Sequence, residues 1–82
     1  MVIIDRDSHF EKTFEKFRDP VLKEKVKKQI RKIIQNPEIG KPMRYGRKGT
    51  REAYIKPFRL SYAFLPGEDK IILLELYHKY EQ

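Results

Sequence analysis

The chain has 82 residues and no cysteine, and its 19 Lys and Arg outnumber 12 Asp and Glu, which gives a formal net charge of +7. This length allows one small domain with a thin core, and the absence of cysteine excludes disulfides and thiolate metal sites. The excess of positive charge attracts polyanions or an acidic partner, although a basic surface without a specific ligand carries the same charge.

The N-terminal segment predicts a strand followed by a helix. Residues 2–4 form a β-branched run, and residues 5–8 offer several possible N-caps. Phe10, Phe14 and Phe17 follow at helical spacing, so we expect them to form the buried face of the first helix.

A second helix is predicted between two proline signals. Asp19 and Pro20 supply an N-cap and a first-turn proline, and Asn36 with Pro37 ends the helix. The apolar stripe of this helix consists of Leu22, Val26, Ile30, Ile33 and Ile34. The opposite face is basic and consists of Lys23, Lys25, Lys27, Lys28, Arg31 and Lys32, relieved only by Glu24. A solvated helix face explains this pattern, and contact with phosphate is the alternative.

The second half of the chain predicts extended segments at residues 43–45, 51–56, 58–65 and 70–80. A hairpin turn is expected at residues 66–69, and Pro57 indicates a bend between two segments because it cannot donate a ladder hydrogen bond. Large apolar residues alternate with small or polar ones in the segment that begins at Phe58, so one face packs on the helices and Arg59 lies on the open face.

These elements predict an α+β fold with the coarse order β-α-α-β-β-β. Two N-terminal helices pack on one face of a small, mostly antiparallel, twisted sheet, and the other face is expected to be concave and basic. No linker or repeat interrupts the chain, so residues 1–82 are expected to form a single domain.

Nothing in the sequence predicts a membrane segment. The longest apolar run, residues 71–74, is far shorter than the roughly 20 residues that span a bilayer, and no basic-then-apolar signal pattern opens the sequence. We therefore expect a cytoplasmic protein with no membrane partner.

Cations and aromatic residues are concentrated in the second half of the chain. They are Arg44, Tyr45, Arg47, Lys48, Arg51, Tyr54, Lys56, Arg59, Tyr77, His78, Lys79 and Tyr80. Cations bind phosphate and flat rings stack on unpaired bases, so this mixture is typical of a surface for single-stranded RNA. For any single tyrosine, a place in the core or at the rim of the sheet is the favoured explanation.

The sequence offers side chains for RNA cleavage but no pattern for a metal or a cofactor. His9 and His78 are the only histidines and lie far apart in the chain, so we expect neither a metal site nor a cofactor. Attack on an RNA phosphodiester then requires side chains as base, as charge-stabilising cation and as acid. Arginine suits the second role, and histidine, lysine or tyrosine suits proton exchange.

The stretch from Arg51 to Tyr62 resembles the central strands of the RelE/ParE toxin superfamily, in which an Arg-hydrophobe-x-Tyr motif starts the second strand. Here that motif is Arg59-Leu60-Ser61-Tyr62. The apolar segment at residues 70–76 and the closing residues 77–80 are similar to the last strand of these toxins, and the resemblance covers essentially the whole chain. It implies a RelE-like toxin: a metal-free, ribosome-dependent endoribonuclease that cuts messenger RNA and is neutralised by an acidic, RelB-like antitoxin.

The resemblance also implies roles for individual residues. Arg59 matches the strand arginine that contacts the scissile phosphate. Lys79 or His78 matches the basic residue that stabilises charge or exchanges a proton, and Tyr80 is the candidate for the terminal aromatic residue. The expected RNA contacts are Arg44, Arg47, Lys48, Arg51 and Lys56.

Two questions stay open at the level of the sequence. Simple pairing across an even-length loop puts Arg59 opposite Leu76, whereas an odd-length loop or a bulge brings Tyr77 and Lys79 onto its face. The function also has alternatives, because a ParE-like toxin that inhibits DNA gyrase without catalysis, or a catalytically silent RNA-binding module, would carry much of the same charge.

Overall fold

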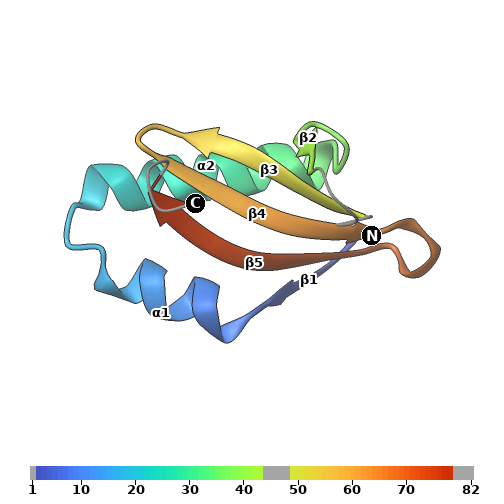
Figure 1. Cartoon of the computed structure of the whole chain (residues 1–82), viewed down its shortest axis with the longest axis horizontal. Coiled ribbons are helices and arrows are strands. Elements are labelled where there is room, and N and C mark those ends of the chain that lie inside the picture. The colour runs from blue at the N-terminus through green and yellow to red at the C-terminus, as the bar shows by residue number, and fades with distance from the viewer. Residues whose placement is uncertain (1, 44–48, 79–82) are drawn as a thin grey trace.

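The computed structural model describes residues 2–43 and 49–78 of the chain. In chain order its elements are β1 (Ile3–Arg6), α1 (Ser8–Lys16), α2 (Pro20–Gln35), β2 (Lys41–Pro42), β3 (Thr50–Ile55), β4 (Phe58–Leu65), a 3-10 turn (Pro66–Glu68) and β5 (Lys70–His78) (Figure 1). The predicted α+β class and the β-α-α beginning are confirmed. Of the strand expected at residues 43–45, only Met43 is described: it follows the two-residue β2, and its backbone N–H donates to the carbonyl of Thr50. Residues 44 and 45 lie outside the described residues.

Within the described residues, five strands form one sheet in the order β1-β5-β4-β3-β2. The first strand runs parallel to the last, and all other neighbours are antiparallel, which confirms the mostly antiparallel sheet. The two-residue β2 lies at one edge, where Pro42 is tolerated because an edge strand can do without one N–H donor.

Both helices begin where the sequence predicts. The carboxylate of Asp7 accepts a hydrogen bond from the backbone N–H of His9 at the start of α1, and Asp19 accepts one from Val21 at the start of α2. The hydrogen bonds from the backbone and side chain of His9 lower the pKa of Asp7 below its usual value. The capped ends satisfy backbone donors that would otherwise have no partner inside the helix.

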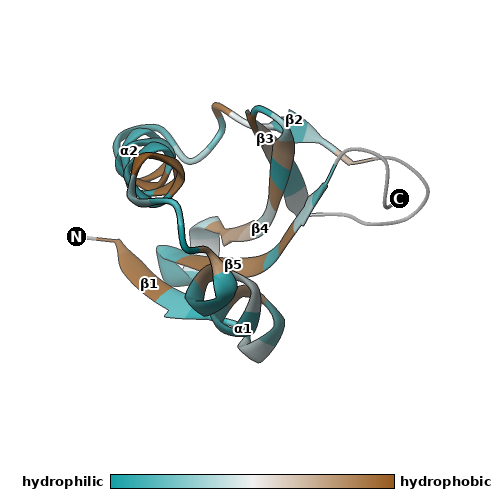
Figure 2. Ribbon diagram, turned by 90° about the vertical axis from the view of Figure 1, so that its left-hand side faces the viewer, coloured by the Kyte–Doolittle hydropathy of each residue, from teal (hydrophilic) through white to brown (hydrophobic). Residues whose placement is uncertain are grey.

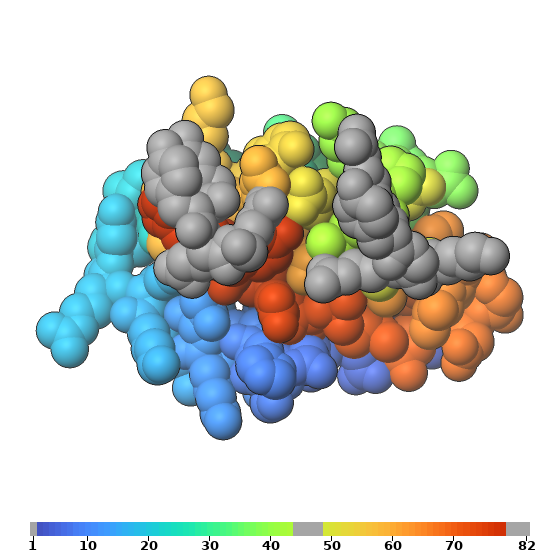
Figure 3. Space-filling model, viewed as in Figure 1, coloured from blue at the N-terminus to red at the C-terminus, as the bar shows by residue number. Residues whose placement is uncertain are grey.

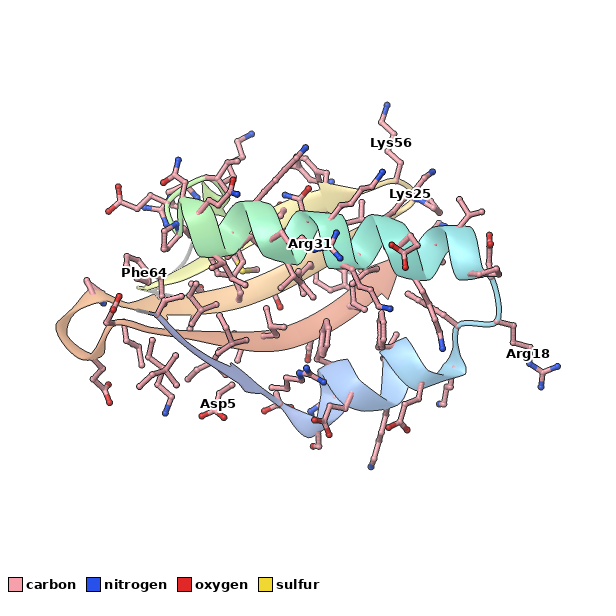
Figure 4. All side chains as sticks on the ribbon, turned by 180° about the vertical axis from the view of Figure 1, so that it is seen from behind. Asp5, Arg18, Lys25, Arg31, Lys56 and Phe64 are labelled. Carbon is pink, nitrogen blue, oxygen red and sulfur yellow. The ribbon has the colours of Figure 1, made fainter. Side chains whose placement is uncertain are left out.

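The core lies between the two helices and the face of the sheet that they cover, seen from behind in Figure 4. Its buried apolar residues are Phe10, Val26, Ile33, Ala53, Ile55, Leu60, Tyr62, Ile71, Leu73 and Leu76. The predicted alternation along the strands is visible in Figure 2, where the ribbons change between brown and teal. Ile34 departs from the predicted stripe of α2, because its side chain is 39% exposed.

Tyr62 in β4 holds residues 37–40, which follow α2, against the sheet by two hydrogen bonds. Its fully buried hydroxyl donates to the carbonyl of Pro37 over 2.7 Å and accepts from the backbone N–H of Gly40 over 2.9 Å. Burial raises the pKa of Tyr62, since the charged phenolate loses more hydration than the neutral phenol. Gly40 is required here because a Cβ atom at this position would lie 2.6 Å from the Tyr62 hydroxyl.

The helices show no candidate membrane span within the described ranges, since none is both long and apolar enough to cross a bilayer. Among the same residues, no three histidine or carboxylate side chains are grouped so as to hold a metal ion.

Candidate functional site

A β-bulge decides which residue of β5 lies beside Arg59. Pairing across the turn begins with Leu65 opposite Lys70 and, continued without interruption, would place Leu76 opposite Arg59. The register shifts by one between Ser61 and Tyr62, so Arg59 lies opposite Tyr77. The bulge alternative of the sequence analysis is therefore the one that the structure adopts for this pair.

Arg59 belongs to a group of four side chains on the sheet face opposite the helices. Its Nη1 atom lies 3.5 Å from the carboxylate of Glu52, and its guanidinium lies 5.0 Å from the centre of the Tyr54 ring. Glu52 also accepts hydrogen bonds from Tyr77, over 2.7 Å, and from Tyr54, over 3.4 Å. We call Glu52, Tyr54, Arg59 and Tyr77 the Arg59–Glu52 cluster.

The register of three strands produces this cluster. Tyr54 is paired with Arg59 across β3 and β4, and Glu52 lies two residues before Tyr54, on the same face of β3. The side chains of Glu52 and Arg59 are only 14% and 27% exposed, so their attraction is screened less than that of a fully solvated pair. The cluster is therefore an oriented group, not a chance surface contact.

Glu52 was not among the residues predicted for the site. Cations and aromatic rings are the residue types that indicate an RNA surface, and a single carboxylate among many basic residues gives no separate signal in the sequence. The alternation of side chains along a strand was the signal that could have found it, because Glu52 and Tyr54 lie two residues apart and must share a face. A tight turn at Lys56 and Pro57 then brings that face beside Arg59.

His78 lies away from Arg59, on the side of the sheet that carries the helices. Its ring packs edge-on against Phe58 at 5.5 Å, and Phe58 in turn contacts Phe17 after α1 at 4.9 Å. The structure does not bring His78 and Arg59 together. Lys79 and Tyr80 lie outside the described residues.

Of the residues predicted to contact RNA, Arg51 and Lys56 are described and have different environments. Arg51 donates to the backbone carbonyls of Gly40 at 2.7 Å and of Glu38 at 3.1 Å, so it holds the segment after α2. Lys56 is exposed at the turn between β3 and β4. Arg44, Arg47 and Lys48 lie outside the described residues.

The expected basic character of the open face is not seen in its described part. Arg59 faces Glu52, and Lys70 lies 3.1 Å from the carboxylate of Asp5. Glu75 adds a further negative charge opposite Ser61. Figure 3 shows this face, with β3, β4 and β5 in yellow, orange and red above the blue α1.

A hollow of about 340 Å³ adjoins the cluster on the same face. It is lined by Asp7, His9, Met43, Thr50, Ser61, Leu74 and Glu75. Ser61 links the two features, because it is paired with Glu52 on one side and with Glu75 on the other. A ligand held at the cluster thus has a neighbouring depression in which to extend.

The sequence model of one protein family matches residues 5–82, and its description is the ParE toxin of the type II toxin-antitoxin system parDE. The chain belongs to the ParE toxin family. The resemblance to the RelE/ParE superfamily is thus confirmed, and the chain is a toxin of a type II toxin-antitoxin system. No curated protein is matched by the sequence of this toxin.

Solved structures share the fold of this toxin at low sequence identity. A chain of the Escherichia coli RelBE toxin-antitoxin complex is 18% identical with a TM-score of 0.82, and each chain is covered over 100%. The YoeB/ParE toxin from Agrobacterium tumefaciens is 16% identical with a TM-score of 0.85, over 96% of this chain and 100% of that one. A chain of the Mycobacterium tuberculosis RelBE2 toxin-antitoxin complex is 20% identical with a TM-score of 0.79, over 95% of this chain and 98% of that one.

Proposed function

We propose that this toxin cleaves messenger RNA on the ribosome by metal-free attack of a ribose 2′-hydroxyl. The observation that carries the proposal is the Arg59–Glu52 cluster: a guanidinium, a carboxylate and two phenols meet on the sheet face opposite α1 and α2. These are the chemical groups that such a reaction needs as charge-stabilising cation, base and acid.

In this mechanism Glu52 acts as the general base. It takes the proton of the 2′-hydroxyl as that oxygen attacks the adjacent phosphorus, and the bond from phosphorus to the 5′-oxygen breaks. The leaving oxygen receives the phenolic proton of Tyr77, which recovers a proton from Glu52 through their 2.7 Å hydrogen bond. The products are a 2′,3′-cyclic phosphate and a 5′-hydroxyl, so atoms and protons balance.

Arg59 stabilises the charge that gathers on the non-bridging phosphate oxygens. A guanidinium has five N–H donors, and the contact with Glu52 uses Nη1, which leaves donors for a phosphate. Loss of one such preorganised donor group costs about 10²- to 10³-fold in rate in comparable sites. Lys79 and Tyr80 remain proposed contributors of charge and of an aromatic contact, and His78 is proposed to support the strand through Phe58.

Toeprinting of a programmed ribosome tests the proposal. We expect the wild-type toxin to produce cuts in the decoding site that persist with a metal chelator and disappear with Arg59→Ala. Lys12→Ala, at an exposed position of α1, is the matched control and should cut normally. An absence of cuts with the wild-type toxin would reject the ribonuclease.

Inhibition of DNA gyrase without catalysis is the second candidate. The family whose model matches is named for ParE, and the described cations of the open face are already paired with carboxylates. A supercoiling assay separates the two: inhibition of gyrase by both the wild-type toxin and Arg59→Ala, without ribosomal cuts, would support this candidate. Binding of RNA with neither activity would point to the silent module.

We also infer an acidic, RelB-like antitoxin as partner. The E. coli and M. tuberculosis relatives are toxin-antitoxin complexes, and the net charge of +7 on this toxin favours an acidic protein. Ribosomal or gyrase targets both require the cytoplasm, which is the location that we propose.

A further inference from the structure

We propose that the groove between α2 and β3 binds single-stranded RNA that flanks the cleaved position, with lysines on its phosphates and one base held at the β3–β4 turn. This inference rests on the proposed function, because it names where the substrate runs on leaving the Arg59–Glu52 cluster. It assigns a role to the helix face for which the sequence left solvation and phosphate contact open.

Lysines from two separate elements meet at this groove. Lys25, Lys28 and Lys32 of α2 line a hollow of about 260 Å³, together with Lys56 from the β3–β4 turn. The remaining lining residues are Gln29, Tyr54 and Ile55. Figure 4 shows Lys25 and Lys56 projecting side by side from their two elements. We call this feature the lysine groove.

The lysine groove carries no compensating carboxylate among its described lining residues. The acidic residue nearest on α2, Glu24, lies 3.7 Å from Lys27, which is not part of the groove. Positions three and four residues apart share one helix face, so Lys25, Lys28 and Lys32 repel one another and Lys56 adds to that repulsion. A polyanion that lies along the groove relieves this repulsion.

A second hollow connects the lysine groove with the cluster. It has a volume of about 440 Å³ and is lined by Tyr54, Lys56, Pro57, Phe58 and Arg59. Tyr54 and Lys56 line both hollows, so the two hollows lie next to each other between α2 and Arg59. Tyr54 keeps 51% of its surface exposed although the Arg59 guanidinium lies over its ring.

This combination favours RNA over an acidic peptide. Carboxylates of an acidic peptide would pair with the lysines, but they would not stack on the Tyr54 ring or on the Arg59 guanidinium. A nucleobase stacks on aromatic rings and on guanidinium planes, while its phosphate contacts lysine. We call the hollow lined by Tyr54, Lys56, Pro57, Phe58 and Arg59 the aromatic hollow. A single RNA strand alternates phosphates with bases, so it can place phosphates in the lysine groove and a base in the aromatic hollow.

The lysine groove is tested by the salt dependence of RNA binding. The probe is a fluorescent, fully 2′-O-methylated oligonucleotide of about 12 nucleotides, which binds but cannot be cut. Each phosphate contact of a single strand contributes about 0.7 to the slope of log K against log salt. Lys25→Gln, Lys28→Gln and Lys32→Gln together should therefore reduce the slope by about 2.

The matched control removes the same charge from the other helix. The combined variant Lys12→Gln, Lys16→Gln and Arg18→Gln changes three exposed positions on or next to α1 and should leave the slope nearly as in the wild type. Equal losses in both triple variants, or no loss in either, would overturn the proposal. An unchanged RNA slope combined with weaker binding of poly-L-glutamate would assign the groove to an acidic protein instead.

The aromatic hollow has its own readout. An oligonucleotide that carries 2-aminopurine should lose fluorescence on binding to the wild type and to Tyr54→Phe, because the base stacks, and should stay bright with Tyr54→Leu. Quenching by all three proteins would overturn the base site. Neither assay depends on cleavage. If the triple-lysine variant lowers the salt slope but the wild-type toxin makes no ribosomal cuts, only the proposed catalysis is refuted. If the wild-type toxin cuts but the triple-lysine variant leaves the salt slope unchanged, only the groove is refuted.

Discussion

The hydroxyl of Tyr77 in β5 donates a 2.7 Å hydrogen bond to Glu52 in β3, and the two residues come from strands that flank β4 on opposite sides. The bond exists because the bulge at Ser61 and Tyr62 turns Tyr77 toward the open face, where regular pairing would have turned Leu76. One irregularity in the sheet therefore determines the neighbours of the candidate base.

Replacing Glu52 by Gln tests its role as general base. The amide keeps the size of the side chain but accepts no proton, so the rate of ribosomal cleavage should fall about 10²- to 10⁴-fold. Single-turnover cleavage measures the rate, and the melting temperature checks that the fold is intact. Cleavage by Glu52→Gln at the wild-type rate would eliminate Glu52 as the base.

Gly40→Ala should destabilise the fold. The added methyl group would lie 2.6 Å from the Tyr62 hydroxyl and 3.0 Å from the carbonyl of Glu52, so the segment after α2 has to shift. We expect the free energy of unfolding to drop by about 1–3 kcal/mol in urea denaturation. Gly67→Ala is the control, since a methyl group there meets nothing within 4 Å, and it should change stability by less than about 0.5 kcal/mol.

Tyr62→Phe should change how stability responds to alkaline pH. Burial raises the pKa of Tyr62, so the unfolded chain releases this proton first and the wild type loses stability as the pH rises above about 10. The Phe variant lacks this contribution but leaves Pro37 and Gly40 without their partner, so it should be about 1–3 kcal/mol less stable at neutral pH. The difference in free energy of unfolding between the wild type and Tyr62→Phe should therefore become smaller as the pH rises above about 10, measured by urea denaturation. A difference that does not change with pH would contradict the raised pKa of Tyr62.

Asp7→Asn should alter the acid side of the stability profile. An Asn side chain still caps α1 but does not titrate. The pKa of Asp7 is lowered in the folded state, so its stabilising effect is present above about pH 4 and is lost as the pH falls through the folded pKa. The wild type should therefore lose more stability than Asp7→Asn between about pH 5 and pH 3, measured by urea denaturation at each pH.

Salt should weaken the complex with the antitoxin. Exposed ion pairs between the basic toxin and an acidic partner are screened within about 8 Å at physiological ionic strength. Calorimetric titration at increasing sodium chloride should give a steadily larger Kd. An affinity that is the same at low and high salt would remove charge as the basis of this recognition.

The sequence was sufficient for the elements whose signals are local. Asp19 and Pro20 start α2 where expected, and Pro66 to Asp69 forms the predicted turn, with Asp69 in the left-handed conformation. These features depend on hydrogen bonds and dihedral angles within a few residues. The family resemblance carried by Arg59 and Tyr62 was also confirmed.

The parts that could not be predicted depend on contacts between distant segments. The bulge changes the partner of Arg59 although the loop length alone favoured Leu76. The sequence did not show that the guanidinium of Arg51 donates to carbonyls of Glu38 and Gly40, because only the folded segment after α2 presents them. His78 faces Phe58 because strand parity after the bulge turns it toward the helices.

The parallel pairing of β1 with β5 has a consequence for synthesis of the toxin. Ile3 to Arg6 leave the ribosome well before their partners Lys70 to Leu73, which lie more than 60 residues later in the chain. Contacts so far apart in sequence form late, because the intervening chain must be ordered before the sheet can close. Nascent chains interrupted before β5 thus lack both Tyr77 and the strand that joins β1 to β4, so neither the sheet nor the Arg59–Glu52 cluster can be completed.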